Sequence, residues 1–557
     1  MSLKPTLVQP VPKETIQVAR AAFPKGNLYL TLRDKLGSIF HDEDFADLFP
    51  TDGQPALPPW RLALVTILQF RENLPDRQAA EAVRGRIDWK YLLGLELTDA
   101  GFDFSVLSEF RGRLLEGGQE AILLDKLLEH CQGLGLLQER GKQRTDATRV
   151  LAAIRVMSRL ELVAETVRAA LNDLATLAPD WLRGVAPVEW YQRYSRRIED
   201  DRLPDSKEKR AVYAQTVGED GFVLLDLLQG PEAPPQFGQL PSIEALRQVL
   251  ARHYECVMDE PEGRQHRQVR FKTNRELPPA AEGIESPYDP EARFRSRHAT
   301  TWTGYQVHLS ETCEADEVHL ITHVETTKAT VHESQKTESI HQALVAKGLP
   351  PDQHLVDSAY IDAALLVSSH EQFDITLVGP GRLDNTWQAK VEGAYDHYSF
   401  EIDWDQKQVR CPQGKTSAIW RDLSDQYGPY YQVIFDGNDC RACQARSLCT
   451  RNKSQPRRLR LQPRVQYEAL QRARQLQSTE AGRQLYNARA GIEGTISQGV
   501  RGFGLRQSRY WGLAKTHLQH LATASAINMD RLGAWFEERP LAKTRVSCFA
   551  RLAPLAA

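Results

Sequence analysis

The stretch LYNARAGIEGTISQGVRGFG, residues 485–504, carries the most informative pattern in this sequence. Tyr486, Arg489 and Glu493 are spaced i, i+3 and i+7, so on an α-helix they lie within about 60° of one another. A solvated helix face carries such polar residues without any further role. A phenol and a guanidinium beside a carboxylate can also contact phosphates while the carboxylate binds a metal ion. The spacing therefore predicts a helix with a phosphate- and metal-binding face.

Two aspartates upstream supply further oxygen ligands of the kind that Mg2+ or Mn2+ prefers. Asp146 lies in KQRTDATRV, residues 142–150, and Asp357 follows the apolar run QHLV. We expect both at or near strand ends, with Glu493 reaching in from its helix. Two divalent ions roughly 3.5–4 Å apart, bridged by carboxylates, can activate the attacking oxygen of a phosphodiester reaction and stabilise the leaving oxygen. An isolated aspartate near a strand end is more often a turn former or a helix cap.

The Y-x2-R-x3-E helix resembles the signature of a large group of bacterial insertion-sequence DDE transposases, whose catalytic core is RNase H-like. Four further stretches are similar to that group in the same order: RTDATRV (144–150), GYQVHLSET (304–312), THVETTKATVHES (322–334) and LVDSAYID (355–362). Residues 71–115 look like the helical domain that precedes the core. The resemblance covers roughly residues 55–535. It implies that Asp146, Asp357 and Glu493 bind Mg2+ or Mn2+ at the catalytic site, with Tyr486 and Arg489 beside them.

Two features depart from the pattern of that group. A lysine commonly follows the glutamate by seven residues, but Val500 stands at this position, with Arg501 next to it. Whether Arg501 or the later Lys515 contacts phosphate instead stays open.

A long, mostly helical stretch, residues 151–275, separates the first aspartate from the strands that follow. We expect an insertion there, and its role is not readable from the sequence.

The whole chain is expected to be a multidomain α/β protein, because 557 residues exceed the size of one core. Its composition, 41% hydrophobic and 26% charged, is that of a folded globular protein. We expect a linker or arm at 1–57, a helical DNA-binding domain at 58–135, RNase H-like core strands at 136–150 and 276–380, and the helical insertion at 151–275. A strand-rich, cysteine-containing insertion at 381–464, catalytic-core helices at 465–535 and a tail at 536–557 complete the chain.

Strands are expected where apolar and β-branched residues alternate. These segments are 304–313, 317–327, 353–360 and 373–381 in the core, and 397–405 and 430–437 in the cysteine-containing insertion. The first two core segments are joined by an acidic turn, which predicts a hairpin. The last core strand follows an intervening helix.

Basic residues are the candidates for DNA contacts, although the formal net charge of the chain is only -3. Short amphipathic segments after Trp60 carry Arg77 and Arg84 on polar faces, as a helix-turn-helix-like unit does, but many small helical domains look alike. Residues 451–475 hold eight basic residues against one acid; a solvated face is the simpler interpretation. In the DNA-binding interpretation, the phosphate contacts come from Arg457, Arg458, Arg460, Arg501 and Lys515.

Four cysteines form the pattern C-x28-C-x2-C-x5-C, with a Pro and a Gly shortly after the first. Four thiolates are the ligand set of a closed structural zinc site. Free core thiols or a redox pair are the alternatives, because one C-x2-C is a weak signal. The candidate zinc ligands are Cys411, Cys440, Cys443 and Cys449.

The expected partner is double-stranded DNA, both the element ends and the target, with a dimer in the complex that holds two ends together. The amino terminus has no apolar h-region and no stretch is apolar enough for a membrane helix, so we expect a cytoplasmic, nucleoid-associated protein. The expected function is strand cleavage and strand transfer by a transposase. The alternatives are an RNase H-like nuclease without strand transfer and a domesticated, non-catalytic DNA-binding protein.

Overall fold

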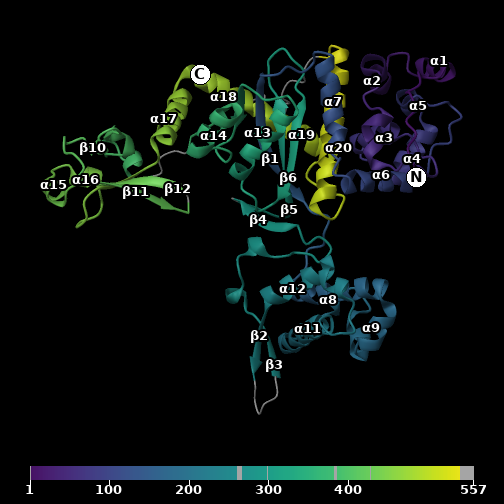
Figure 1. Ribbon diagram of the computed structural model, residues 1–557, viewed down its shortest axis with the longest axis horizontal. Helices are drawn as coiled ribbons and strands as arrows, with labels where there is room; N and C mark the ends of the chain where they lie inside the picture. The colour runs from purple at the N-terminus through teal and green to yellow at the C-terminus, as the bar shows by residue number, and fades with distance from the viewer. Residues whose placement is uncertain (1, 260–265, 298, 382–385, 427, 540–557) are drawn as a thin grey trace, which may run out of the picture.

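A mixed β-sheet lies at the centre of the protein (Figure 1), in a computed structural model that describes residues 2–259, 266–297, 299–381, 386–426 and 428–539. A helical body that contains the N-terminus lies on one side of this sheet, and a small strand-rich body lies at the opposite end of the molecule. A third, mostly helical body projects below the sheet. Most of the expected C-terminal tail, residues 540–557, lies outside the described residues.

The central sheet has the order β4-β5-β1-β7-β8, with β6 also paired to β5. Its strands are β1 (Lys142–Leu151), β4 (Arg293–Arg297), β5 (Thr300–Thr312), β6 (Ile321–Lys328), β7 (Gln353–Val356) and β8 (Thr376–Val378). β5 runs antiparallel to β1, β4 and β6, whereas β7 runs parallel to both β1 and β8. The four expected core segments after the insertion contain strands, and β1 lies in the expected core segment 136–150. β4 was not expected.

Helices cover the sheet, and one of them joins it to the N-terminal body. The helices of this region are α13 (Thr337–Ala346), α14 (Ala363–Phe373), α17 (Arg464–Ser478), α18 (Glu480–Asn487), α19 (Gly491–Phe503) and α20 (Leu513–Phe536), with the 3-10 turn η10 (Ala488–Ala490) between α18 and α19. α20 packs against β6 on one side and against N-terminal helices on the other. It is therefore buried around most of its circumference.

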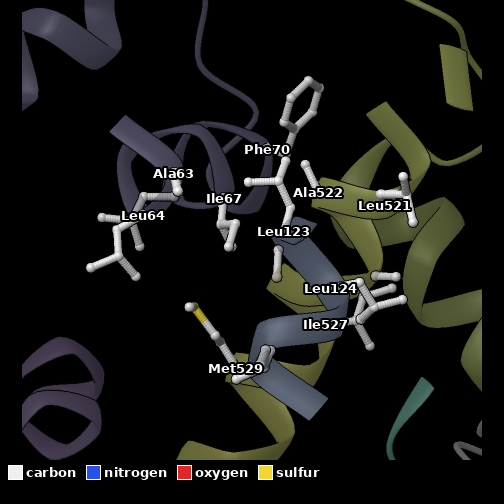
Figure 2. Close-up of a cluster of buried hydrophobic side chains, with 14 of the residues drawn as sticks. Ala63, Leu64, Ile67, Phe70, Leu123, Leu124, Leu521, Ala522, Ile527 and Met529 are labelled. Carbon is white, nitrogen blue, oxygen red and sulfur yellow. The ribbon is translucent and has the colours of Figure 1, made fainter. Parts of the chain in front are cut away.

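The N-terminal body consists of α1 (Lys13–Ala22), α2 (Leu28–Leu36), the 3-10 helix η1 (Asp42–Leu48), α3 (Pro59–Arg71), α4 (Asp76–Gly85), α5 (Ile87–Leu93), α6 (Ser105–Glu116) and α7 (Ile122–Gly133). Figure 2 shows side chains of α3 and α7 packed with side chains of α20, among them Ile67, Leu123 and Ile527. One apolar core thus runs from this body into the sheet.

Residues 1–57 differ from the expected linker or arm. They contain α1, α2 and η1, and buried side chains such as Tyr29, Leu32 and Phe45 belong to the main core. Pro12 lies directly before α1 and Gly37 ends α2, whereas the Pro- and Gly-containing residues 50–57 form no helix. Because the apolar residues come in short runs between these breakers, no sustained helical period is visible in the sequence.

The expected helical insertion contains α8 (Arg159–Leu177), α9 (Pro179–Val185), α10 (Val188–Tyr194), α11 (Lys207–Leu227) and α12 (Pro241–His253). These helices form a core of their own, which includes Val163, Trp190 and Leu246. An antiparallel pair that the sequence analysis did not expect, β2 (Tyr254–Asp259) and β3 (His266–Phe271), follows α12. The insertion is thus a separately packed body.

The strand-rich body carries the cysteines and contains two small sheets. One pairs β9 (Glu401–Asp403) with β10 (Gln408–Arg410), and the other has the order β11-β12-β13, which are Ile419–Asp425, Gly428–Ile434 and Arg458–Leu461. Two short helices, α15 (Gly437–Ala442) and α16 (Arg446–Cys449), lie between β12 and β13. In the described part of the chain, no helix combines the length and apolar character needed to cross a membrane.

Candidate active site

Neighbouring parallel strands bring the two aspartates together. Thr145 of β1 lies opposite Val356 of β7 in the register, so Asp146 and Asp357 are the next residues on each strand. Adjacent strands are about 4.8 Å apart. Asp357 directly follows β7, as expected, but Asp146 lies in the interior of β1, because β1 continues to Leu151 in its pairing with β5. The end of one strand therefore meets the middle of the other.

Arg489 connects the β1 aspartate to the glutamate of α19. Its Nη2 donates to Oδ2 of Asp146 at 2.7 Å, and its Nη1 donates to Oε1 of Glu493 at 3.3 Å. The side chains of Arg489 and Asp146 are 13% and 17% exposed, whereas that of Glu493 is 67% exposed. The site is thus open to solvent at Glu493, whereas Asp146 and Arg489 are largely shielded from solvent.

The ionisation of this cluster is shaped by burial and by mutual charge. Burial raises the pKa of Asp146 to about 6; Arg489 opposes this shift, and the charges of Asp357 and Glu493 add to it. Burial lowers the pKa of Arg489, but the surrounding acidic groups raise it by more, to a net value above its ordinary one. Asp357 and Glu493 both act on the buried Asp146, so the three carboxyl groups lie near one another. Such a set attracts a cation.

Tyr486 lies near this cluster but not on the same regular α-helix as Glu493. It belongs to α18, Arg489 lies in η10, and Glu493 is in the first turn of α19. Burial raises the pKa of Tyr486, Arg489 lowers it, and the three carboxylates raise it further. The expected continuous helix is thus interrupted by a 3-10 turn, yet Tyr486 stays near enough to Arg489 and the three carboxylates for their charges to affect it.

A cavity of about 420 Å³ extends from Asp146 and Glu493 along α19. Its polar lining residues are Asp146, Thr148, Glu493, Ser497, Arg501 and Arg506. Arg501, one of the two expected substitutes for the missing lysine, therefore faces the site. Lys515 is exposed on α20 and does not line this cavity.

Arg506 is a site residue that the sequence analysis missed. Its Nε donates to Oγ1 of Thr148 at 2.8 Å, and no carboxylate of the described chain forms an ion pair with it. Gly504 ends α19 with φ 63°, a left-handed conformation that favours glycine, and turns the chain back toward β1. The backbone N–H of Leu151 then donates to the carbonyl of Arg506 at 2.8 Å. No spacing in the sequence marks this contact, because it joins the end of β1 to a distant loop.

The four cysteines of the expected zinc site line one cavity of about 360 Å³. Cys411 follows β10 and begins a tight turn in which the Gly414 N–H donates to its carbonyl. Burial raises the pKa of Cys449 to about 11; Arg457 lowers it and the other three thiols raise it further. The fold thus brings the thiols together from three separate segments. Each of the seven cysteines in the described part of the chain is a free thiol.

The remaining expected DNA-binding arginines have different surroundings. Arg458 and Arg460 lie exposed on one face of the β11-β12-β13 sheet, where Arg460 also pairs with Asp425 at 2.8 Å. Arg457 instead donates to the carbonyl of Cys449 and lines the cysteine cavity. Arg77 and Arg84 are exposed on α4; Arg77 stacks on Phe104, and Arg84 donates to the carbonyl of Ala100.

Within the described residues, no three or more His, Cys, Asp or Glu side chains are already arranged to hold a metal ion. At the carboxylates, the guanidinium of Arg489 lies between Asp146 and Glu493, where a shared cation would bind. The oxygen ligands fit Mg2+ or Mn2+ by their chemistry. An ion bound in that position by both carboxylates would replace the guanidinium of Arg489.

Two parts of the chain match known protein families. Residues 410–533 match the family described as Transposase DDE domain. Residues 17–113 match the family described as Transposase domain (DUF772). The first match contains Tyr486, Arg489 and Glu493, and neither match includes Asp146 or Asp357. No curated protein matches the chain.

Proposed function

We propose that this chain, which carries the domains of an insertion-sequence DDE transposase, binds the terminal inverted repeats of its element and catalyses strand cleavage and strand transfer. The observation that carries the proposal is the arrangement of the three acids. Arg489 bridges Asp146 to Glu493, and Asp357 follows the strand next to Asp146. Asp146 and Glu493 also line one cavity together with Arg501 and Arg506. The sheet order, with three antiparallel strands followed by two parallel ones, supports an RNase H-like core.

Each residue of the site has a separate part in this proposal. Asp146, Asp357 and Glu493 would hold Mg2+, which supplies positive charge at the attacking and leaving oxygens of an in-line phosphoryl transfer. Arg489, once released from the carboxylates, donates to a phosphate beside the scissile bond, and the Tyr486 hydroxyl contacts the same strand. Arg501 and Arg506 hold the phosphates that follow along the cavity. Cleavage and strand transfer are both in-line displacements, so one site serves both.

The experiment compares carboxylate variants with a matched control on the neighbouring helix. Asp146→Asn, Asp357→Asn and Glu493→Gln should each abolish Mg2+-dependent cleavage of duplex DNA from the flanks of the gene while DNA binding persists. Glu480→Gln on α18, whose side chain is 71% exposed, should cleave like the unchanged protein. If one of these variants still cleaves the DNA, the residue that it changes does not belong to the catalytic site.

The two alternatives give different products in the same assay. A nuclease without strand transfer would release cut ends but form no product joined to target DNA. A non-catalytic DNA-binding protein would bind the flanking DNA and leave it intact in Mg2+ and in Mn2+. Imperfect inverted repeats close to both ends of the gene would favour the transposase over both.

Further DNA contacts are proposed for the sheet face that carries Arg458 and Arg460. Arg421 lies opposite Gln432, which in turn lies opposite Arg460, so these residues share that face. Arg77 and Arg84 of α4 are proposed as a second contact region. Because such contacts release counterions from DNA, binding should weaken steeply with salt.

A complex that holds two element ends would need a dimer, and a cytoplasmic location beside the nucleoid follows from the same function.

A structural zinc ion is proposed for Cys411, Cys440, Cys443 and Cys449. The shared cavity and the proximity of the thiols support it, although the side chains must close further to coordinate the metal. Metal analysis of the purified protein should find about one zinc per chain, lost in Cys443→Ser and kept in Cys256→Ser, whose thiol is exposed elsewhere. An unchanged protein without zinc would leave the cysteines as free core thiols.

A further inference from the structure

Buried charges lie next to the candidate active site but do not face its cavity. Glu311 of β5 is fully buried and pairs with two arginines, Arg144 of β1 and Arg531 of α20. The Arg144 Nε donates to Oε1 of Glu311 at 2.7 Å, and the Arg531 Nη1 donates to Oε2 at 2.7 Å. Thr495 of α19 donates to the same carboxylate at 2.6 Å. These groups connect the sheet to both C-terminal helices.

Arg144 also reaches the chain segment that carries the catalytic arginine. Its Nη1 donates at 2.6 Å to the carbonyl of Ala488, the residue directly before Arg489. Arg144 and Asp146 are two residues apart on β1 and therefore lie on the same face of the strand. Two arginine links thus join β1 to η10: one runs from Arg144 to the Ala488 carbonyl, and the other runs from Arg489 back to Asp146.

The two links differ in what happens when the carboxylates bind a cation. The Arg489 link uses an oxygen of Asp146, so a metal ion that takes the place of the guanidinium between Asp146 and Glu493 breaks it. The Arg144 link uses a backbone carbonyl and a buried glutamate, neither of which belongs to the proposed metal ligands. The Arg144 link can therefore persist while Arg489 turns to the DNA.

The chain leaves space for this contact at Gly491. A Cβ added to Gly491 would lie 2.0 Å from Nη1 of Arg144, which is far inside van der Waals contact. Gly491 begins α19 directly after η10, and its φ is -63°, so no left-handed conformation requires glycine there. The side chain is excluded by the guanidinium of Arg144 itself. By contrast, a Cβ at Gly494 on the same helix would meet nothing within 4 Å.

We infer that Arg144 is a positioning residue that holds the η10–α19 junction, and with it Arg489 and Glu493, in register with Asp146 when Arg489 leaves the carboxylates. This inference rests on the proposed function, because it assigns Arg144 a part in the cleavage site. Glu311 keeps the guanidinium of Arg144 oriented, and Arg531 supplies the second charge that the buried glutamate needs.

The test uses two glycine-to-alanine variants that change no charge. Gly491→Ala should displace Arg144 from the Ala488 carbonyl and lower Mg2+-dependent cleavage on the order of tenfold to a hundredfold, since small misplacements of catalytic groups have effects of this size. Gly494→Ala should cleave like the unchanged protein. Binding of a mixed-sequence DNA duplex should be the same in both. Arg144→Lys keeps a charge beside Glu311 but cannot reach both partners, so it should fold and lose cleavage as Gly491→Ala does.

Hydrogen–deuterium exchange supplies a readout that does not depend on activity. Amides of residues 488–493 should exchange faster in Gly491→Ala than in Gly494→Ala, with the rest of the sheet unchanged. Equal exchange and equal cleavage in the two alanine variants would overturn the inference. If the unchanged protein does not cleave DNA at all, the proposed function fails, while the exchange difference still decides whether Arg144 holds the junction.

Discussion

At the scale of one residue, Glu311 shows how a buried carboxylate keeps its negative charge in this core. Burial raises the pKa of its carboxyl, but Arg531 and Arg144 lower it by more, so the net pKa is below its ordinary value. A carboxylate with a depressed pKa stabilises the fold above its unfolded pKa, and this contribution is lost as the pH falls through the folded one. At neutral pH the pair with the two arginines is therefore complete.

Glu311→Gln should remove that stabilisation and leave the buried guanidinium of Arg144 and the half-buried one of Arg531 without their carboxylate. We expect a loss of about 3 kcal/mol in the free energy of unfolding at neutral pH, the order found when a buried ion pair is broken. The loss should shrink as the pH is lowered, because Glu311 then becomes protonated in the unchanged protein. Urea unfolding at several pH values measures it, and a difference that grows toward acid would contradict the assignment.

The end of α19 shows how one element places a residue of the site. Gly504 in its left-handed conformation turns the chain so that residues 505–508 pair with the end of β1 and Arg506 reaches Thr148. A Cβ at Gly504 would meet only Asn73 Oδ1, at 3.9 Å, so the backbone conformation and not space requires glycine. The turn, more than the helix, determines where this arginine lies.

Gly504→Ala should therefore cost about 1 kcal/mol of stability and lower both DNA binding and cleavage, because Arg506 moves with the turn. Gly502→Ala is the matched control, since Gly502 lies inside α19 with open space around its Cα. Alanine there should stabilise the helix by up to about 1 kcal/mol. Thermal unfolding and a cleavage assay compare the two. Unchanged cleavage in Gly504→Ala would remove Arg506 from the site.

At the scale of the whole molecule, the insertion after β1 is a separately packed body, and we expect it to unfold as a unit of its own. Its core shares no residue with the core that joins the N-terminal helices, the sheet and α20. Asp220 of α11 holds this insertion together by accepting hydrogen bonds from Trp190, Arg193 and Tyr194 at 2.7–2.9 Å. The carboxylate is almost fully buried among these donors.

Asp220→Ala should destabilise the insertion by about 3–5 kcal/mol, because three buried or half-buried donors lose their acceptor. The central sheet and the N-terminal body should keep their unfolding temperature. Calorimetry should then resolve a low-temperature transition for the insertion apart from the main one. One transition that moves as a whole would show that the bodies unfold together.

The sequence by itself determined the local features: the core strands other than β4, the Tyr486, Arg489 and Glu493 spacing, and the cysteine spacing. Each depends on neighbours within one element, where hydrophobic period and residue type carry the information. It did not show the helices of residues 1–57 or the β2–β3 pair, because short apolar runs between Pro and Gly carry no clear period. From the sequence, Asp146 was expected near a strand end. This expectation was wrong because the pairing of β1 with β5 continues the strand to Leu151.

Only the tertiary structure decided which distant residues meet. The contact of Arg506 with Thr148 and the link from Arg144 to Ala488 both join segments far apart in the chain. Such contacts follow from the packing of whole elements, and no local propensity encodes them. The sequence identified which side chains are chemically suited to the site. The fold decided which of them face its cavity, because packing fixes the direction of each side chain.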